Sequence, residues 1–300
     1  MKLFPRPGLK SSLAITTNIG CRNMCSYCPQ STVIKAYRER SGIKKMSLET
    51  FKSCMKTVPK NIPLSFSGFS EPWLNPECSA MLLHAGEQGY PIRVNTTLIG
   101  MKTADVALLS KLSFIKFVVH LPDNQQLTRI KVDQTYLEVL GQLAQSNMPA
   151  LHWKFHKSSP DIDLHPEVAA KLQKSQAQIE YFGLNNRAGL VETALNYAPV
   201  NRGRVLRPCQ DFHHNILLPN GEVALCHMDW PLRHILGNLL HDNYRDLHKG
   251  QPFQEILDGL GKPEADILCR ACEKDQVKRS LPGQISHSLR KRLGGKKDIY

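Results

Sequence analysis

The sequence predicts an α/β fold in which a parallel sheet with helical crossovers is followed by a smaller C-terminal unit. Two patterns carry this prediction: six short apolar segments alternate with helix-like segments up to about residue 184, and a hairpin pattern begins after about residue 200. With 300 residues, 41% of them apolar and 22% charged, the composition is that of an ordinary globular protein with a sizeable core.

Six segments have the length and apolar character of buried strands. They are "SLAITT" (12–17), "PLSFSG" (63–68), "PIRVNTT" (91–97), "FIKFVVHL" (114–121), "ALHWKFH" (150–156) and "QIEYFGL" (178–184). The segments between them place apolar residues at helical spacing, and Ser47 is in position to cap the first. They are "MSLETFKSCMKTV" (46–58), "ECSAMLLHAGEQG" (77–89), "TADVALLSKL" (103–112), "QTYLEVLGQLAQ" (134–145) and "HPEVAAKLQKS" (165–175).

This alternation implies right-handed crossovers and a parallel sheet. Six strands are too few for a closed eight-stranded barrel, so a partial barrel and an open doubly wound sheet both remain. In either architecture the loops at the C-terminal ends of the strands form the working face. The segment "GCRNMCSYCPQ" (20–30) directly follows the first strand, so we expect it on that face.

After about residue 200 the pattern is that of a hairpin. A strand "HNILL" (214–218), a turn "PNGE" (219–222) and a return strand "VALC" (223–226) follow one another. A helix-like "YRDLHKGQPFQEILDGL" (244–260) and the knuckle "CRACEK" (269–274) complete the unit. We therefore expect a core domain over 1–198, a small auxiliary domain over 199–277, and a basic, flexible tail over 278–300.

The formal net charge of +13 raises the local concentration of polyanions without selecting one. Part of it lies in the tail, which we interpret as solvated; nucleic acid, an acidic protein and a phosphorylated substrate are alternative partners. The N-terminus lacks a signal-peptide run and no segment has the ~18 apolar residues of a membrane helix. We therefore expect a cytoplasmic protein with no membrane partner.

Three cysteines with CX3CX2C spacing, Cys21, Cys25 and Cys28, form the first cysteine group. A structural zinc site needs four ligands, and no further Cys or His lies near, because Cys54 falls on the apolar face of the helix over 46–58. Three cysteines on a 4Fe-4S cluster leave one iron open to another ligand. The spacing therefore favours a cluster, and zinc with a distant fourth ligand remains an alternative.

The segment "CRNMCSYC" (21–28) resembles the signature of radical S-adenosylmethionine (radical SAM) enzymes, including the aromatic Tyr27 before the last cysteine. "FSGFSEPWLNPE" (66–77) resembles the GGEP segment of that family, which holds the amino group of the methionine moiety. Gly68, Glu71 and Pro72 match this pattern, whereas Phe69 and Ser70 stand where it has small residues.

Two further strand ends fit the same family. "RVNTTLIG" (93–100) resembles its TNG-type stretch, with Asn95 matching and Thr96 replacing a glycine, and His120 stands where a Ser often lies near the ribose. The resemblance thus implies a set of S-adenosylmethionine-binding residues. They are Tyr27, Gly68, Ser70, Glu71, Asn95 and His120.

The second cysteine group combines Cys209 and Cys226 of the hairpin with Cys269 and Cys272 of the knuckle. Four thiolates suit either a closed zinc site or a fully ligated 4Fe-4S cluster, and spacing alone does not decide. The arrangement CX9-15GX4C with a later CX2C resembles the SPASM and twitch radical SAM enzymes, and Gly237 and Asn238 fit the characteristic turn of their linking segment. The resemblance implies one auxiliary cluster, serving electron transfer or structure. Cys54 and Cys78 are expected as buried core thiols.

The resemblance implies a partial (β/α)6 radical-SAM barrel with a small C-terminal twitch/SPASM-like domain. Its cofactors would be two 4Fe-4S clusters and S-adenosylmethionine, with flavodoxin or ferredoxin as electron donor. Reductive cleavage of S-adenosylmethionine would give a 5′-deoxyadenosyl radical that abstracts hydrogen from the substrate. The twenty residues before Cys21 leave no room for a cobalamin-binding or peptide-recognition domain there.

A closed auxiliary cluster suits a net oxidation, and the chain resembles the twitch-type aminocyclitol dehydrogenases in size and cluster count. We therefore expect oxidation or rearrangement of a small polar metabolite. Maturation of a peptide or protein side chain is the enzymatic alternative, and a zinc-bearing nucleic-acid-binding protein is an alternative of another class. Candidates for a general base facing the cavity are Lys154, His156, His213 and His214.

Overall fold

The six predicted core strands form parallel neighbours in chain order in the computed structural model, which describes residues 11–146, 148, 150–156, 160–173, 178–182, 186–191, 203–272 and 276–277. Their bounds are β1 Ser12–Ile15, β2 Leu64–Phe66, β3 Ile92–Thr96, β4 Phe114–Leu121, β5 Leu151–His156 and β6 Ile179–Phe182. An unbroken order places every right-handed crossover on one face, whereas a doubly wound sheet reverses its order. The partial barrel is therefore confirmed, and the open doubly wound alternative is wrong.

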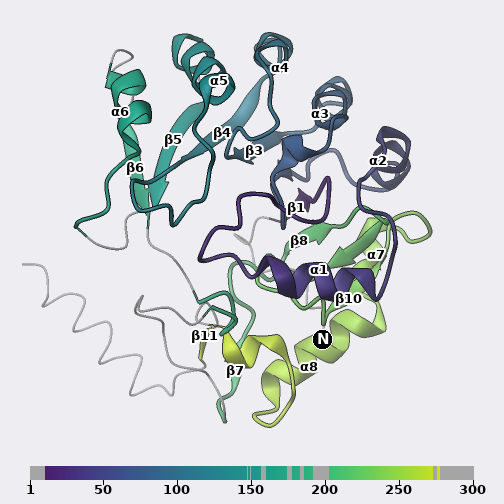
Figure 1. The fold of residues 1–300 in the computed structure, drawn as a ribbon. Helices are drawn as coiled ribbons and strands as arrows, with labels where there is room; N and C mark the ends of the chain where they lie inside the picture. The colour runs from purple at the N-terminus through teal and green to yellow at the C-terminus, as the bar shows by residue number, and fades with distance from the viewer. Residues whose placement is uncertain are drawn as a thin grey trace, which may run out of the picture.

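The predicted crossover helices lie in a row along the outer side of this arch (Figure 1). They are α2 Leu48–Met55, α3 Cys78–Glu87, α4 Thr103–Leu109, α5 Gln134–Gln145 and α6 Pro166–Gln173. Ser47 caps α2 as predicted, because its side chain accepts a hydrogen bond from the backbone N–H of Thr50.

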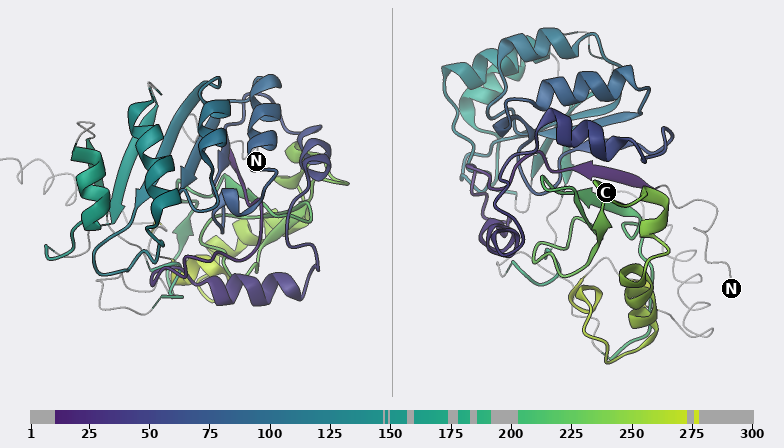
Figure 2. Two further views of the ribbon diagram at one scale, coloured as in Figure 1. Left: turned by 45° about the horizontal axis from the view of Figure 1, so that its top comes forward. Right: turned by 90° about the vertical axis from the view of Figure 1, so that its right-hand side faces the viewer.

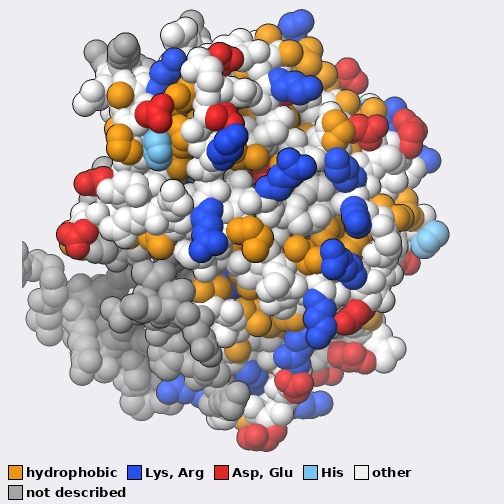
Figure 3. Space-filling model, in the orientation of Figure 1, with side chains coloured by type: hydrophobic (Ala, Val, Ile, Leu, Met, Phe, Trp, Pro, Cys, Tyr) orange, Lys and Arg blue, Asp and Glu red, His pale blue; other side chains and the backbone are white. Residues whose placement is uncertain are grey.

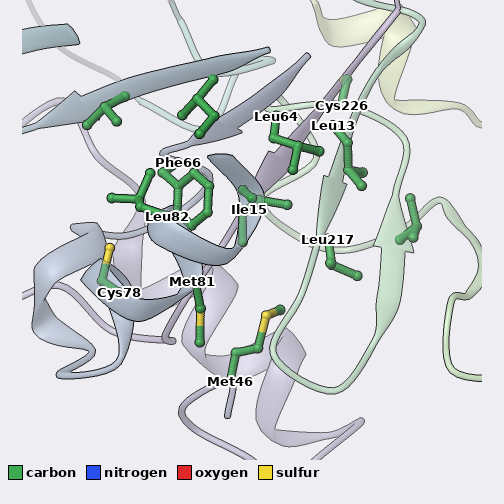
Figure 4. Packing of buried hydrophobic residues seen from close by; sticks show 14 of the residues in the cluster. Leu13, Ile15, Met46, Leu64, Phe66, Cys78, Met81, Leu82, Leu217 and Cys226 are labelled. Atoms are coloured by element: carbon green, nitrogen blue, oxygen red, sulfur yellow. The ribbon is translucent and has the colours of Figure 1, made fainter. Parts of the chain in front are cut away.

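The main core fills the space between the sheet and these helices. Leu13, Ile15 and Phe66 point from β1 and β2 toward Met81 and Leu82 of α3, as Figure 4 shows. Since side chains alternate along a strand, the residues between them face the inside of the arch. The inner face is thereby left to the polar and small residues of the strands.

Helix α1, Gln30–Arg38, was not predicted; it follows the cysteine loop. Its buried Val33 and Tyr37 belong to a second apolar cluster with Ile216 and Trp230. Arg40, just after the helix, forms a bidentate ion pair with Glu222: its Nε donates to Oε2 at 2.9 Å and its Nη2 donates to Oε1 at 2.8 Å. Helix α1 thus packs against the C-terminal hairpin.

The predicted hairpin is present as β8 His214–Leu217 and β9 Glu222–Ala224. Gly221 has a φ of +87°, which suits glycine, and the N–H of Leu218 donates to the carbonyl of Glu222 across the turn. Strand β8 also pairs in parallel with β1, so the hairpin extends the main sheet. The predicted boundary between 198 and 199 lies outside the described residues and remains a prediction.

A strand β10, Ile235–Asn238, adds to β9 where the sequence analysis expected only a linking segment. Gly237 and Asn238 end this strand, and Asn238 opens the turn that follows, because its carbonyl accepts a hydrogen bond from the N–H of His241 at 3.0 Å. The full sheet order is β10-β9-β8-β1-β2-β3-β4-β5-β6. A separate pair joins β7 Leu206–Arg207 and β11 Gln276–Val277.

The predicted helix over 244–260 is divided into α7 Tyr244–Leu247 and α8 Gln251–Gly261. Gly250 and Pro252 lie at the break, where proline suits the first turn of a new helix. Short 3₁₀ helices lie at Pro72–Leu74 and Leu268–Ala271. Figure 2 shows α8 at the end of the molecule away from α4 and α5.

Among the described residues, no helix has the length and apolar character needed to span a membrane. On the face shown in Figure 3, Lys and Arg side chains are scattered, with Asp and Glu among them. The predicted basic tail over 278–300 lies outside the described residues.

Candidate functional site

The cysteine loop opens onto a cleft of about 480 Å³ at the C-terminal ends of the core strands, a volume within the usual range of small-molecule sites. All three cysteines of the loop line this cleft. The six residues that the sequence analysis assigned to S-adenosylmethionine line it too: Tyr27, Gly68, Ser70, Glu71, Asn95 and His120. Four loops distant in sequence therefore meet at one site.

The three thiols of the loop are close enough to influence one another. Burial, with a smaller contribution from the neighbouring thiolates of the loop, raises the pKa of Cys21 to about 11 and that of Cys25 to about 12. A bound cation reverses such a shift, because metal ligation requires the thiolate. The donor set thus fits a cationic iron-sulfur group.

All nine cysteines are free thiols. Within the described part of the chain, no group of three Cys, His, Asp or Glu side chains is arranged to hold a single metal ion. In a 4Fe-4S cluster each cysteine binds a different iron, so its sulfur atoms need not converge on one point.

Glu71 joins the loop after β2 to the loop after β3. Its Oε1 accepts a hydrogen bond from the hydroxyl of Thr96 at 2.6 Å, and its Oε2 accepts from the backbone N–H and the hydroxyl of Thr97 at 2.6 and 2.8 Å. The backbone N–H of Trp73 also donates to Oε1, at 3.4 Å. These bonds make Glu71 an anchor for both loops, and its direct contact with a ligand remains a prediction.

Gly68 allows the loop after β2 to pack against β1. Its φ is +69°, and a Cβ there would lie 2.0 Å from Oγ1 of Thr16. The N–H of Phe69 donates to that same Oγ1, at 3.2 Å, and the Ser70 hydroxyl donates to the carbonyl of Gly20. Although Phe69 departs from the family pattern, its ring packs 4.9 Å from that of Trp230. A large side chain is therefore accommodated at this position.

Three aromatic side chains pack against one another along one wall of the cleft. The rings of Tyr27 and His156 lie 4.4 Å apart, and those of His156 and His120 lie 5.8 Å apart. Burial, reinforced by the cations Lys154 and Arg187, lowers the pKa of His120 to about 4. Burial, with His120 and the same cations, lowers that of His156 to about 2. Both imidazoles are neutral at pH 7, and the role of His156 as a proton acceptor remains a prediction.

Sequence reasoning missed several residues of the cleft. The side chain of Gln30, which opens α1, accepts from the N–H of Cys21 and donates to the carbonyl of Phe69. Arg187 donates from Nε to the carbonyl of Tyr27 at 3.3 Å and lies 5.8 Å from the ring of Trp230. Gln30 directly follows the cysteine motif and could have been considered, whereas Arg187 lies outside any recognisable pattern.

A second cavity of about 420 Å³ lies inside the arch and shares Ser67, Gly68, Asn95 and His227 with the cleft. Lys154 and His214 line it, as predicted for groups that face the cavity. Lys154 also forms an ion pair with Glu180 at 3.4 Å, and Nδ1 of His214 lies 3.8 Å from Oδ1 of Asp211.

His213 lies elsewhere and lines neither cavity. Its ring packs 5.8 Å from Phe212, 5.6 Å from His248 and 5.9 Å from Phe253. Burial lowers its pKa. The prediction that His213 faces the reaction cavity is therefore corrected: it belongs to the packing between the hairpin and α8.

The second cysteine group is brought together as predicted. Cys209, Cys226, Cys269 and Cys272 line one enclosed cavity, and each is less than 10% exposed. Burial, then Asp229, then the thiolates of Cys272 and Cys209 raise the pKa of Cys226. This buried set of four fits a fully ligated cluster.

One acidic side chain supports this second group. The side chain of Asp229 accepts from the N–H groups of Arg233 and His234 at 2.8 Å each, which holds the loop after Cys226. Cys54 and Cys78 are fully buried in the main core, as expected of structural thiols.

Residues 209–273 match the family model of the SPASM iron-sulfur cluster-binding domain. No curated protein matches the chain. Among solved structures, BtrN in complex with AdoMet and 2-DOIA is similar to it with 18% identity, a TM-score of 0.56, and coverage of 88% of this chain and 93% of BtrN.

Two further solved structures are similar over most of the chain. Streptococcus suis SuiB bound to the precursor peptide SuiA has 12% identity and a TM-score of 0.58, covering 88% of this chain and 71% of SuiB. The protein anSMEcpe with bound AdoMet has 11% identity and a TM-score of 0.58, covering 88% of each chain. With the family model and the strand order, these similarities lead to one conclusion: the chain has the partial-barrel fold of radical SAM enzymes with a C-terminal SPASM-type iron-sulfur domain.

Proposed function

We propose that the protein is a radical SAM enzyme that oxidises or rearranges a small polar metabolite. One observation carries the proposal: the three-cysteine loop lines a cleft that shares Ser67, Gly68, Asn95 and His227 with a second cavity inside the barrel. A cofactor at the loop and a substrate in the barrel would therefore lie in neighbouring spaces separated by these shared residues.

In this proposal Cys21, Cys25 and Cys28 hold a 4Fe-4S cluster, and the cleft beside them binds S-adenosylmethionine. When bound, these groups supply reductive cleavage of S-adenosylmethionine and a 5′-deoxyadenosyl radical that abstracts hydrogen from the substrate. The protein supplies position and the exclusion of water. Glu71 and Gly68 fix the two loops that form the floor, while Phe69 and Trp230 close one side with apolar surface.

The second cysteine group would hold an auxiliary cluster with no open iron. His227 directly follows Cys226 and lines both cavities, so this group lies next to the cavity wall. Such a position suits an acceptor for the electron that leaves an oxidised substrate. A flavodoxin or ferredoxin would supply the electron that starts the reaction.

Modification of a peptide or protein side chain is a second candidate. Its support comes from two similar structures, SuiB bound to the precursor peptide SuiA and anSMEcpe with AdoMet and the Cp18Cys peptide. We prefer the hypothesis of a small-metabolite substrate, because the similarity to BtrN extends over 93% of that chain and the BtrN structure contains 2-DOIA. Deuterium transfer from labelled metabolites or labelled peptides into 5′-deoxyadenosine separates the two.

The experiment that tests the proposal is metal and sulfide analysis of anaerobically reconstituted protein, followed by reaction with dithionite and S-adenosylmethionine. We expect about eight irons and eight sulfides per chain, from two clusters, and formation of 5′-deoxyadenosine. Two zinc ions without sulfide would instead support the zinc-bearing nucleic-acid-binding alternative. Absence of 5′-deoxyadenosine from protein that carries both clusters would contradict the proposal.

A further inference from the structure

The cavity inside the arch has an unusual charge distribution. Arg93, Lys116 and Lys154 line it from three consecutive strands, β3, β4 and β5. Among the described residues that line it, none is an Asp or Glu. The cavity is therefore cationic where a substrate would lie.

One nearby carboxylate compensates part of this charge. Glu180 lies 3.7 Å from Nζ of Lys116 and 3.4 Å from Nζ of Lys154, and it also contacts Nδ1 of His152 at 2.6 Å. A single carboxylate is thus shared by three basic side chains. Lys116 therefore shares its carboxylate partner with two other basic side chains.

Arg93 stands apart from this group. Its half-buried side chain lines the cavity, and within the described part of the chain its guanidinium has no hydrogen bond or ion pair. A guanidinium has five N–H donors in a planar fork that matches a carboxylate or a phosphate. Leaving these donors half-buried without an acceptor costs free energy, which a bound anion would recover.

The neighbours of Arg93 favour the same ligand. In the sheet register it lies between Ser65 of β2 and Lys116 of β4, which provide a hydroxyl and a second cation. Lys154 of this cavity and Arg187 of the cofactor cleft also contribute to the lowered pKa values of His120 and His156, after burial. The interior therefore carries a positive potential.

The position of Arg93 sets a distance to the cofactor cleft. It precedes Asn95 by two residues on β3, with both side chains on the inner face, and Asn95 lines both cavities. Two strand residues span about 7 Å. An anion at Arg93 would therefore hold the rest of a small molecule against the cleft.

We infer that the substrate is a small metabolite with a carboxylate or phosphate group, and that Arg93 binds this group inside the barrel beside Lys116. The inference rests on the proposed function and names its substrate class. Arg93 is in this view a substrate-binding residue that sets which molecules reach the cleft.

The test measures anion binding to the reconstituted full chain by isothermal titration calorimetry, in phosphate-free buffer with saturating S-adenosylmethionine to fill the cofactor cleft. The probes are inorganic phosphate, succinate and the uncharged 1,4-butanediol. We expect the wild type to bind phosphate, succinate or both, and to bind the diol much more weakly. Preference for phosphate or for succinate distinguishes a phosphate ester from a carboxylic acid as the natural substrate.

Two substitutions make the test specific to the site. Arg93→Gln should weaken anion binding at least about tenfold, and Arg93→Lys should retain part of it, because lysine keeps the charge without the fork. Arg245→Gln, which removes one positive charge at an exposed position of α7, should bind the anions as the wild type does. Iron content and the unfolding temperature of each variant show whether it is folded.

Equal anion affinity in the wild type and Arg93→Gln would overturn the inference, as would failure of the wild type to bind either anion. Neither result affects the proposed function, which is judged by 5′-deoxyadenosine formation in the wild type alone. Conversely, the protein could bind anions through Arg93 and yet form no 5′-deoxyadenosine. This result would support the anion site and contradict the proposed function.

Discussion

The carboxylate of Glu71 and the backbone of Thr97 are joined by a 2.6 Å hydrogen bond that links the loops after β2 and β3. The Thr97 hydroxyl donates to the same oxygen at 2.8 Å, and it accepts a hydrogen bond from Nδ2 of Asn23 in the cysteine loop. Three segments distant in the sequence are thus connected through one buried acid and one threonine. The shape of the cleft depends on this connection.

Replacing Glu71 should disrupt the cleft. In Glu71→Gln one amide nitrogen must face N–H or O–H donors inside the protein, so we expect a loss of about 2 kcal/mol in the free energy of unfolding and weaker binding of S-adenosylmethionine. Denaturant unfolding and calorimetry measure the two effects. Glu77→Gln is the matched control, because Glu77 is exposed and its bond from the N–H of Leu48 can be kept by an amide oxygen. Equal losses in both variants would contradict the role given to Glu71.

Gly68 should tolerate no side chain. Its φ of +69° disfavours alanine, and the added Cβ would collide with Thr16. We expect Gly68→Ala to lose about 3 kcal/mol of stability, from backbone strain together with overpacking. Gly89→Ala has a similar φ of +75° but no atom within 4 Å of its Cβ, so it should lose only about 1 kcal/mol. Thermal unfolding compares the pair, and similar losses would show that the close approach to Thr16 is unimportant.

The two cysteine groups should be separable by mutation. Cys25→Ala should reduce the iron content from about eight to about four per chain, because the four-cysteine site remains intact. It should also abolish formation of 5′-deoxyadenosine, because the three-cysteine site is lost. Electron paramagnetic resonance of the reduced protein should still show the auxiliary cluster. Cys54→Ala removes a buried thiol of the core and should keep all the iron. Retained cleavage in Cys25→Ala would show that the opening motif has been misinterpreted.

His248 should make stability depend on pH below neutrality. Burial, followed by the charge of His213, lowers the pKa of His248 to about 4 in the folded protein. In the unfolded chain this histidine takes up a proton below about pH 6.5. Its contribution to the free energy of unfolding is therefore fully present above that pH and is lost as the pH falls toward 4.

Between pH 7.5 and 5.5 the contribution of this partly exposed histidine is about 1 kcal/mol. When the pH is lowered from 7.5 to 5.5, the free energy of unfolding of His248→Gln should therefore decrease by about 1 kcal/mol less than that of the wild type. Denaturant unfolding at each pH measures the difference. Parallel pH profiles for the two proteins would contradict the assignment to His248.

Local sequence was sufficient for much of the site. The two cysteine groups were predicted from their spacing, and Gly68 and Glu71 from the resemblance to radical SAM enzymes. The common location of Gly68, Glu71 and the first cysteine group followed from the strand pattern, because loops that follow parallel strands gather at one edge of the sheet. The strand pattern also predicted the hairpin, whose turn at Gly221 needs a left-handed backbone. Helix α1 was missed although, at nine residues, it is longer than the predicted α2, α4 and α6. Strand β10 was missed because it has only four residues and contains a glycine.

The sequence by itself determined the order of strands and helices, the two cysteine groups and the loops that carry them. Only the tertiary structure decided which of two adjacent histidines faces the cavity: His214 does, whereas His213 packs against α8, because register selects the face of each strand residue. It also decided that β8 joins β1, that Thr97 supports Glu71, and that Arg93 meets Lys116 inside the barrel. These are contacts between segments far apart in the chain, and no local pattern encodes them.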